Sequence, residues 1–198
     1  MKRLHSFSGI LPLSVYLIYH LWVNWAALYS RERWVDRVTW IESHCEPTVE
    51  ILFFLSLTLH VFLGLGRKIE SDHPLFVSTS LRRIQRTTGF ASLLFIGLHL
   101  FHLWPLRSGP QQTVRDSYAA LWSGLSEPGC LALYLVGITV VYFHFAHGLS
   151  RAAVSWGLIS SERSLRAVYY AVSVVGIGLW GLTLHLLGHF ATGQGLFG

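Results

Sequence analysis

The sequence predicts an all-α membrane protein in which five helices cross the bilayer as one bundle. Of its 198 residues, 52% are hydrophobic and only 13% carry charge, a balance typical of membrane proteins rather than of soluble domains. Five apolar runs are each long enough to cross about 30 Å of hydrocarbon as a helix of about 20 residues. Because these runs use over half of the chain, we expect a single transmembrane domain over residues 1–198.

The five expected spans are separated by polar segments. They cover residues 7–29, 48–66, 87–106, 129–149 and 167–190. The first run continues well beyond the apolar region of a secretory signal peptide, which is about 7–15 residues long, and it contains His20 and Asn24. We therefore expect it to be a span and not a cleaved signal.

Two segments outside the spans predict short helices. In "SRERWVDRVTWIESHCEP", Trp34, Val38 and Ile41 recur at helical spacing among charges, which indicates a helix lying on the membrane surface. The stretch "YAALWSGL", ahead of the fourth span, favours a second such helix. We expect "SDHPLFVSTS" to form an inner turn and "SERS" to cap the last span. That span contains "GIGLWG", a G-x-G-x-x-G pattern that here indicates close helix packing, because no strand precedes it.

The basic residues are divided unevenly between the two sides of the predicted bundle. With the N-terminus inside, the inner segments carry Lys2, Arg3, Arg67, Lys68, Arg82, Arg83, Arg86, Arg151, Arg163 and Arg166. The outer segments carry Arg31, Arg33, Arg37, Arg107 and Arg115. This asymmetry predicts a cytoplasmic N-terminus and an external C-terminus. It also accounts for the net charge of +5 without nucleic-acid binding.

Four of the eleven histidines fall at two matched depths. His60 and His144 each lie seven residues before an arginine at the inner end of their span, which places both roughly 10 Å from the inner boundary. His20 and His99 lie roughly 20–25 Å from that boundary, toward the outer side. Each pair therefore joins two different helices at one level.

Two facing imidazoles at one level are suited to a bis-histidine haem, which helix bundles hold in their cores. The chain has no C-x-x-C-H, so such a haem would be non-covalent and b-type. Zinc fits less well because these levels contain no carboxylate or cysteine, whereas a histidine proton relay is an open alternative. His102 fits the outer level nearly as well as His99, and His147 fits the inner level less well than His144.

Small and basic residues near these levels suit a haem, which is a macrocycle that carries acidic propionate groups. Glycines at positions 64, 89, 97 and 148 would let the macrocycle approach the backbone. Arg3, Arg86 and Arg151, at the inner helix ends, are candidate partners of its propionates.

Four stretches of the chain, taken in order, carry a resemblance to a known family. They are "RLHSFSGILPLSVYLIYHLWVN", "LTLHVFLG", "IQRTTGFASLLFIGLHLFHLW" and "FHFAHGLSRAAVSWGL". They resemble the di-haem cytochrome b subunit of succinate dehydrogenases and fumarate reductases, most closely the single-polypeptide, five-helix anchor of bacteria that use menaquinone. The similarity runs from Arg3 to about Arg163, and the last span matches mainly in kind.

The resemblance implies a ligand set that coincides with the two depth-matched pairs. His60 and His144 would hold a proximal haem near the inner face, and His20 and His99 would hold a distal haem. The spacing from the glycine of "QRTTG" favours His99 over His102. Ser6 joins the inner arginines as a candidate for propionate contact or docking.

The resemblance also implies what such a subunit does. These anchors fasten a flavoprotein and an iron–sulfur protein, which carry the FAD and the clusters, to the inner face of the bacterial cytoplasmic membrane. Electrons pass between the nearest cluster, two b haems and a quinone (menaquinone or another) bound toward the outer face. Glu50 first and Glu46 second are candidates for proton exchange with the quinol, although interfacial carboxylates that reach water fit them equally well.

Several alternatives stay open at the level of sequence. His185 and His189 form one face of the last span and favour an interfacial pair over ligands, a relay or a quinone contact. Cys45 and Cys130 both lie toward the outer side, and either a disulfide or two thiols is expected there. Alternative functions are a cytochrome b anchor of another dehydrogenase or hydrogenase, and a histidine-lined proton or solute transporter.

Overall fold

A computed structural model describes residues 2–66, 79–108 and 113–193 of the chain. Within them it contains seven α-helices and one short 3-10 helix, with no strand. In chain order these are α1 (Lys2–Trp25), η1 (Ala26–Leu28), α2 (Arg31–His44), α3 (Glu46–Leu65), α4 (Thr79–Ser108), α5 (Val114–Ser126), α6 (Pro128–Ser155) and α7 (Glu162–Thr192). The predicted all-α class is confirmed for this part of the chain.

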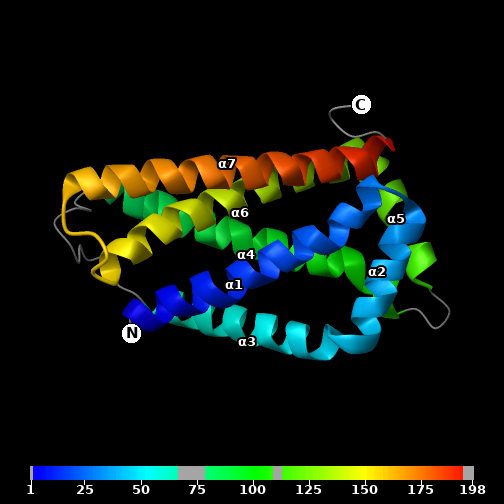
Figure 1. The fold of residues 1–198 in the computed structure, drawn as a ribbon, viewed down its shortest axis with the longest axis horizontal. Coiled ribbons are helices and arrows are strands. Elements are labelled where there is room, and N and C mark those ends of the chain that lie inside the picture. Colours follow the sequence, from blue (N-terminus) through cyan, green and yellow to red (C-terminus); the bar gives the residue numbers. More distant parts are fainter. Residues whose placement is uncertain (1, 67–78, 109–112, 194–198) are drawn as a thin grey trace.

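The five long helices run lengthwise side by side, and the two short ones cross one end of the bundle (Figure 1). α1 packs against α3 and α6, and α6 packs against α4 and α7. α2 and α5 contact each other, and α5 also packs on α7. α1 begins at the opposite end of the bundle from α2 and α5, and α7 ends beside them (Figure 1).

Four of the long helices are apolar enough to cross a membrane. The candidate spans are Arg3–Leu28, Pro47–Leu65, Pro128–Ser155 and Glu162–Thr192. α4 is 30 residues long but is not among these four candidates, which rest on the described residues alone. The fifth span and the orientation of the termini therefore stay predictions.

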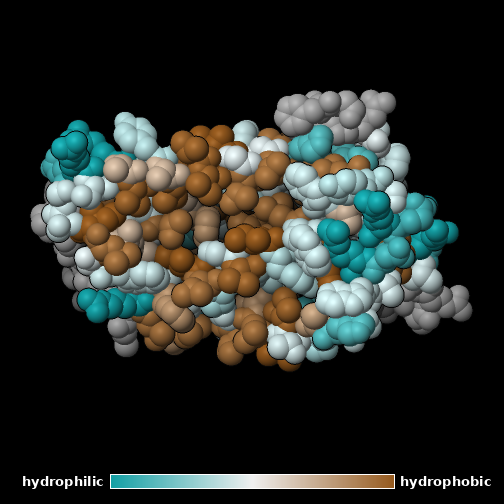
Figure 2. Space-filling view, viewed as in Figure 1, coloured by the Kyte–Doolittle hydropathy of each residue, from teal (hydrophilic) through white to brown (hydrophobic). Residues whose placement is uncertain are grey.

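Large apolar side chains cover the outside of the bundle. Figure 2 shows a broad hydrophobic region over the long helices, with hydrophilic residues gathered at the two ends. Phe101, for example, exposes 79% of its surface, and Phe62 exposes 74%. A surface of this kind requires an apolar environment, and helices satisfy their backbone hydrogen bonds internally in lipid. The chain thus has the surface of a multi-pass membrane protein.

Serine side chains cap the starts of two helices, and the sequence predicted the second of these caps. The side chain of Ser30 accepts from the Arg33 amide at 3.1 Å and starts α2. Ser161, the first residue of "SERS", accepts from the Ser164 amide at 3.2 Å and starts α7. The expected inner turn falls mostly in residues 67–78, outside the described residues. In "GIGLWG", Gly176 faces Ala146 of α6, whereas Gly178 faces open space.

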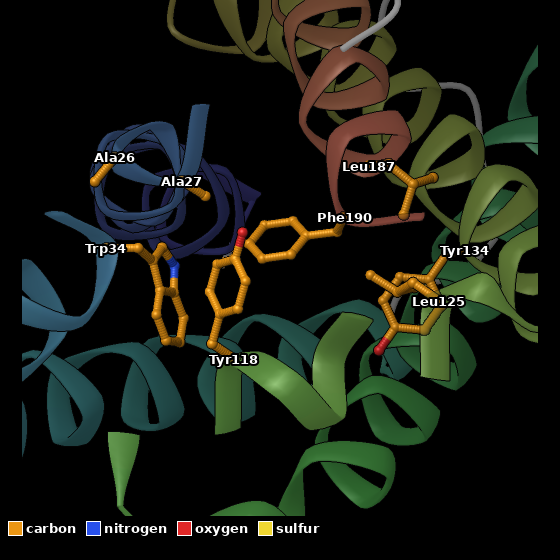
Figure 3. Close-up of a cluster of buried hydrophobic side chains, with 8 residues drawn as sticks. All are labelled: Ala26, Ala27, Trp34, Tyr118, Leu125, Tyr134, Leu187 and Phe190. Atoms are coloured by element: carbon orange, nitrogen blue, oxygen red, sulfur yellow. The ribbon is translucent and has the colours of Figure 1, made fainter. Parts of the chain in front are cut away.

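The main buried apolar cluster lies at the α2 and α5 end of the bundle (Figure 3). Trp34 of α2 meets Tyr118 of α5 with ring centres 5.3 Å apart, and Phe190 of α7 lies 5.5 Å from Tyr118. Ala26, Ala27, Leu125, Tyr134 and Leu187 complete the cluster. This end is therefore joined by side-chain packing among η1, α2, α5, α6 and α7.

Candidate cofactor sites

One pair of predicted ligands meets near the end of the bundle where α1 and α4 begin. His60 on α3 and His144 on α6 place their ring centres 6.4 Å apart, with the ring planes at 78°. The two helices come from distant parts of the sequence, and the rings nevertheless meet, edge to face. This is the inner pair that was expected from depth.

Main-chain carbonyl groups fix the orientation of both inner rings. His60 Nδ1 donates to the carbonyl of His5 at 3.0 Å, and His144 Nδ1 donates to the carbonyl of Gln85 at 3.1 Å. Because a carbonyl only accepts, each Nδ1 must carry the proton, and each Nε2 is then the unprotonated nitrogen. That is the state in which imidazole binds a metal, and second-shell bonds of this type orient metal ligands.

Two glycines make room for the inner rings. A Cβ at Gly9 of α1 would overlap the His60 imidazole, and one at Gly89 of α4 would lie 2.8 Å from His144 Cε1. His5 stacks on His60 with ring centres 4.2 Å apart. Its own imidazole lies against Gly64, where a Cβ would be 3.0 Å from Nε2. The sequence indicated positions 64 and 89 but not Gly9 or the role of His5.

The second pair of predicted ligands lies toward the α2 and α5 end. His20 on α1 and His99 on α4 place their ring centres 6.1 Å apart, at 86°. Asn24 donates to the carbonyl of His20 at 2.9 Å and accepts from Trp34 Nε1 at 3.2 Å, which ties this part of α1 to α2. On α4, Nδ1 of His99 lies 3.1 Å from the hydroxyl of Tyr134.

The ring separations fit one metal ion held between two imidazoles. With metal–nitrogen bonds of about 2 Å on each side, the centres of two axial imidazoles lie roughly 6 Å apart. Both pairs have that spacing. Across the described residues, no group of three or more His, Cys, Asp and Glu gathers as a metal site. The candidate donor sets within the described residues are therefore pairs of imidazoles, as an axially ligated haem requires.

The predicted propionate partners have different surroundings. Arg3 and Arg86 are exposed, and Ser6 and Arg151 are half-buried. Sequence reasoning passed over Arg82, which it used only in the topological count. The Nε and Nη1 atoms of Arg82 are buried with no hydrogen bond in the described part of the chain. Because a buried, unpaired guanidinium is costly, this position favours an anionic partner beyond the described residues.

His147 lies apart from the inner pair although it follows His144 by three residues. It is only 3% exposed, and neither ring nitrogen has a hydrogen bond in the described part. Its ring is parallel to that of Phe143 at 6.2 Å and meets Tyr169 of α7 edge to face at 6.3 Å. It therefore faces α7.

Two hollows lie near the α2 and α5 end. Glu50 lines an open groove of about 610 Å³ along the surface of α3, together with Pro47, Ile51, Phe54, Leu55 and Thr58. The side chain of Glu46 lies outside the described residues. A second pocket of about 360 Å³ lies among η1, α2, α5 and α7, and is lined by residues that include Arg31, Trp122 and His189. Of the residues that line this second pocket, His189 is the one that the sequence analysis had singled out.

The cysteines are free in the structure, so of the two expectations the thiols are observed. Cys45 lies between α2 and α3, and Cys130 lies in the first turn of α6. Both are half-buried.

Comparisons with known proteins give a consistent set of relatives. The chain is 30% identical over 184 residues to the succinate dehydrogenase cytochrome b558 subunit of Bacillus subtilis strain 168, with 90% of both chains covered. It is 28% identical over 201 residues to the fumarate reductase cytochrome b subunit of Helicobacter pylori strain 26695, covering 89% of this chain and 75% of the relative. The subunit of strain J99 matches at 27% identity over the same coverage. No family model matches the chain, and no solved structure gives a significant match.

Proposed function

Because this chain belongs to the cytochrome b subunits of succinate dehydrogenases and fumarate reductases, we propose that it carries electrons between an iron–sulfur partner subunit and a membrane quinone. The observation that carries this proposal is the pair of facing histidine rings at each of two levels, with centres 6.4 and 6.1 Å apart. Two such sites along one bundle are suited to two b haems.

His60 and His144 are proposed as the axial ligands of the proximal haem, and His20 and His99 as those of the distal haem. Haem supplies an iron that takes up and gives back one electron at a time. The chain's own groups orient the ligands: the carbonyls of His5 and Gln85 hold the inner Nδ1 protons. These bonds increase the basicity of the ligating nitrogen.

The inner end of the bundle is proposed to receive the haem propionates and the partner subunits. Arg82 has buried guanidinium atoms without a partner in the described part, so it joins Arg3, Ser6, Arg86 and Arg151 as a candidate propionate contact. A flavoprotein and an iron–sulfur subunit would dock on this face from the cytoplasm of a bacterium. These partners would supply the FAD and the clusters, so this chain would not oxidise succinate itself.

The quinone, for which menaquinone is the first candidate, is proposed to exchange electrons toward the outer side. Glu50 is placed in an open groove on α3, where a carboxylate would accept or deliver the proton that quinone chemistry requires. The pocket lined by Arg31, Trp122 and His189 is the second candidate, because it combines a cation, an aromatic ring and a histidine in one hollow.

Five spans with a cytoplasmic N-terminus would make this electron transfer cross the membrane. One charge moved across the whole bilayer is worth about 2.3 kcal/mol per 100 mV. Unfavourable reduction of a low-potential quinone by succinate would be driven in this way by the membrane potential.

The test is the haem content of the purified complex. Pyridine-haemochrome quantitation and a reduced-minus-oxidised spectrum should give two b haems per chain, and His60→Ala and His99→Ala should each give one. No haem in a folded, haem-supplied chain would contradict the proposal and favour a histidine-lined proton or solute pathway. Co-purification of subunits other than a flavoprotein and an iron–sulfur protein with succinate activity would favour the anchor of another dehydrogenase or hydrogenase.

A further inference from the structure

We propose that Tyr134 is a positioning residue that decides which of two neighbouring histidines on α4 serves the distal haem. It would do so by joining His99 and His102 through its single hydroxyl group. The inference rests on the proposed function. It adds the residue that sets the protonation pattern of the distal ligand and, through it, the potential of that haem.

Tyr134 projects from α6 into the contact between α6 and α4. It is 6% exposed, and its hydroxyl lies 3.1 Å from His99 Nδ1 and 3.0 Å from His102 Nδ1. Phe95 of α4 meets the phenol ring edge to face with centres 5.5 Å apart. Gly137, one turn along α6, allows this approach because a Cβ there would overlap the Phe95 ring. The phenol is therefore held in place by packing as well as by its two hydrogen bonds.

Counting protons shows that the two histidines cannot play the same role. A phenol hydroxyl donates one proton and accepts through its oxygen. Within the described residues its partners are the two Nδ1 atoms, so when both rings are neutral it donates to one Nδ1 and accepts from the other. The histidine that donates from Nδ1 has an unprotonated Nε2 for iron. The histidine that accepts at Nδ1 carries its proton on Nε2 and is unable to ligate.

The surroundings of the two rings give the direction of this chain of hydrogen bonds. His99 faces His20 across 6.1 Å between ring centres, which is the spacing that an iron between them requires. His102 points its Nε2 edge at α5, where a Cβ on Gly124 would lie 3.0 Å from Nε2. A haem does not fit in that contact. The order is therefore His99 Nδ1–H to Tyr134 oxygen, and Tyr134 hydroxyl to His102 Nδ1.

This order makes the hydroxyl a stronger acceptor for the ligand. Hydrogen bonds in a chain polarise one another, so donation to His102 strengthens acceptance from His99. A bond of this type makes the ligating nitrogen more basic and stabilises the oxidised iron. Loss of the hydroxyl is therefore expected to raise the midpoint potential of the distal haem only.

The experiment compares three variants of the assembled complex by redox potentiometry, with each haem followed by its electron paramagnetic resonance signal. Tyr134→Phe should retain two haems per chain, with the midpoint potential of one raised and its signal changed. His102→Leu should retain both haems and shift the same one by less. Tyr142→Phe is the matched control, because that buried tyrosine on the same helix bonds Thr183 at 2.7 Å and, among the described residues, no histidine. It should leave both potentials unchanged.

The possible outcomes test the role of Tyr134 separately from the proposed function. Selective loss of one haem in Tyr134→Phe would also support the positioning role. Two unchanged potentials in Tyr134→Phe would overturn it, as would loss of a haem in His102→Leu while His99→Gln keeps both. If Tyr134→Phe fails to assemble, His102→Leu is the test. A raised midpoint potential of one haem in that variant supports the inference, and an unchanged or lowered potential overturns it. Absence of haem from the wild-type complex would instead overturn the proposed function.

Discussion

At the scale of single residues, the two candidate sites differ in the group that accepts a hydrogen bond from Nδ1 of the candidate ligands. Both inner rings donate to main-chain carbonyls, which no side-chain substitution removes and which enforce one tautomer. His99 instead depends on a hydroxyl group that also serves His102. The inner site is therefore expected to tolerate substitutions around it, whereas the outer site is open to adjustment by single side chains.

Sequence separations were enough to pair the four histidines but not to find the groups that orient them. The depth of each histidine follows from helical rise, and the structure brings the rings of each pair together. His5 and Gln85 act through their carbonyls, which leave no pattern in a sequence. Tyr134 lies 35 positions from His99, so no local spacing connects them. The roles of the four histidines as haem ligands stay a prediction until haem is measured.

Gly9 gives a test of the inner site at this scale. Gly9→Ala should reduce the haem content of the complex from two per chain to one, because a Cβ at this position would overlap the His60 ring. Alanine is otherwise favoured over glycine in a helix by about 1 kcal/mol, so the loss would come from the overlap. The measurement is pyridine-haemochrome quantitation of the purified complex.

Gly178→Ala on α7 is the matched control for Gly9→Ala. A Cβ there would meet nothing within 4 Å, and both haems should be retained. Two haems in Gly9→Ala would contradict the assignment of His60 as an inner ligand held against α1.

At the scale of elements, apolar runs predicted the long helices well and their ends less well. α4 begins at Thr79 and α6 continues to Ser155, beyond the runs that predicted them, because polar residues extend a helix past the hydrocarbon. The surface helix before the second span was predicted from Trp34, Val38 and Ile41 and is present as α2. The weaker signal of "YAALWSGL" is confirmed as α5, which an acidic capping box begins.

The start of α5 gives a test at this scale. Thr113 accepts from the Asp116 amide at 3.3 Å, and Asp116 Oδ2 accepts from the Thr113 amide at 3.0 Å. Thr113→Ala should destabilise the first turn by about 1 kcal/mol, which is roughly fivefold faster exchange of its amide protons. Thr113→Ser should retain wild-type exchange. Unchanged exchange in Thr113→Ala would show that the capping box does not stabilise α5.

The same capping box predicts a dependence on pH. Hydrogen bonds from the Thr113 hydroxyl and amide lower the pKa of Asp116 below its usual value of 3.8. A carboxyl group with a lowered pKa stabilises the folded state above its unfolded pKa, and this stabilisation is lost as pH falls through the lower, folded pKa. Asp116→Asn should therefore speed amide exchange in α5 near neutral pH, with the difference from wild type disappearing in acid. A difference that persists below the folded pKa would contradict this explanation.

At the scale of the whole molecule, side-chain packing is concentrated at one end of the bundle. The aromatic cluster of Trp34, Tyr118 and Phe190 joins α2, α5 and α7 (Figure 3). The long helices elsewhere present large apolar side chains outward. Hydropathy alone predicted five crossings, and four of them are candidate spans within the described residues, so that the crossing by α4 stays a prediction.

Cysteine labelling tests whether α4 crosses the membrane. In a background in which Cys45 and Cys130 are replaced by serine, Gly66→Cys and Thr113→Cys flank α4. If α4 is a span and the N-terminus is cytoplasmic, an impermeant maleimide should label Thr113→Cys in intact cells and should leave Gly66→Cys unlabelled. The positive-inside rule gives this direction.

Ser30→Cys and Ser161→Cys are the controls for the other spans. Ser30→Cys should be labelled from outside, and Ser161→Cys only after the cells are opened. Labelling of Gly66→Cys and Thr113→Cys from the same side would contradict the five-span topology.

The two histidine pairs lie on helices that are synthesised at different times, and this order has a consequence for biogenesis. The ribosome has made both histidines of the outer pair once α4 has emerged, but the inner pair waits for His144 on α6. At about 5–20 residues per second, the second proposed ligand of the inner site follows that of the outer site by a few seconds. Insertion of α6 then adds two groups at once: the second proposed inner ligand, and Tyr134, whose hydroxyl bonds His99. A nascent chain halted between α4 and α6 would therefore hold one half-finished site and one whose orienting hydroxyl has yet to be synthesised.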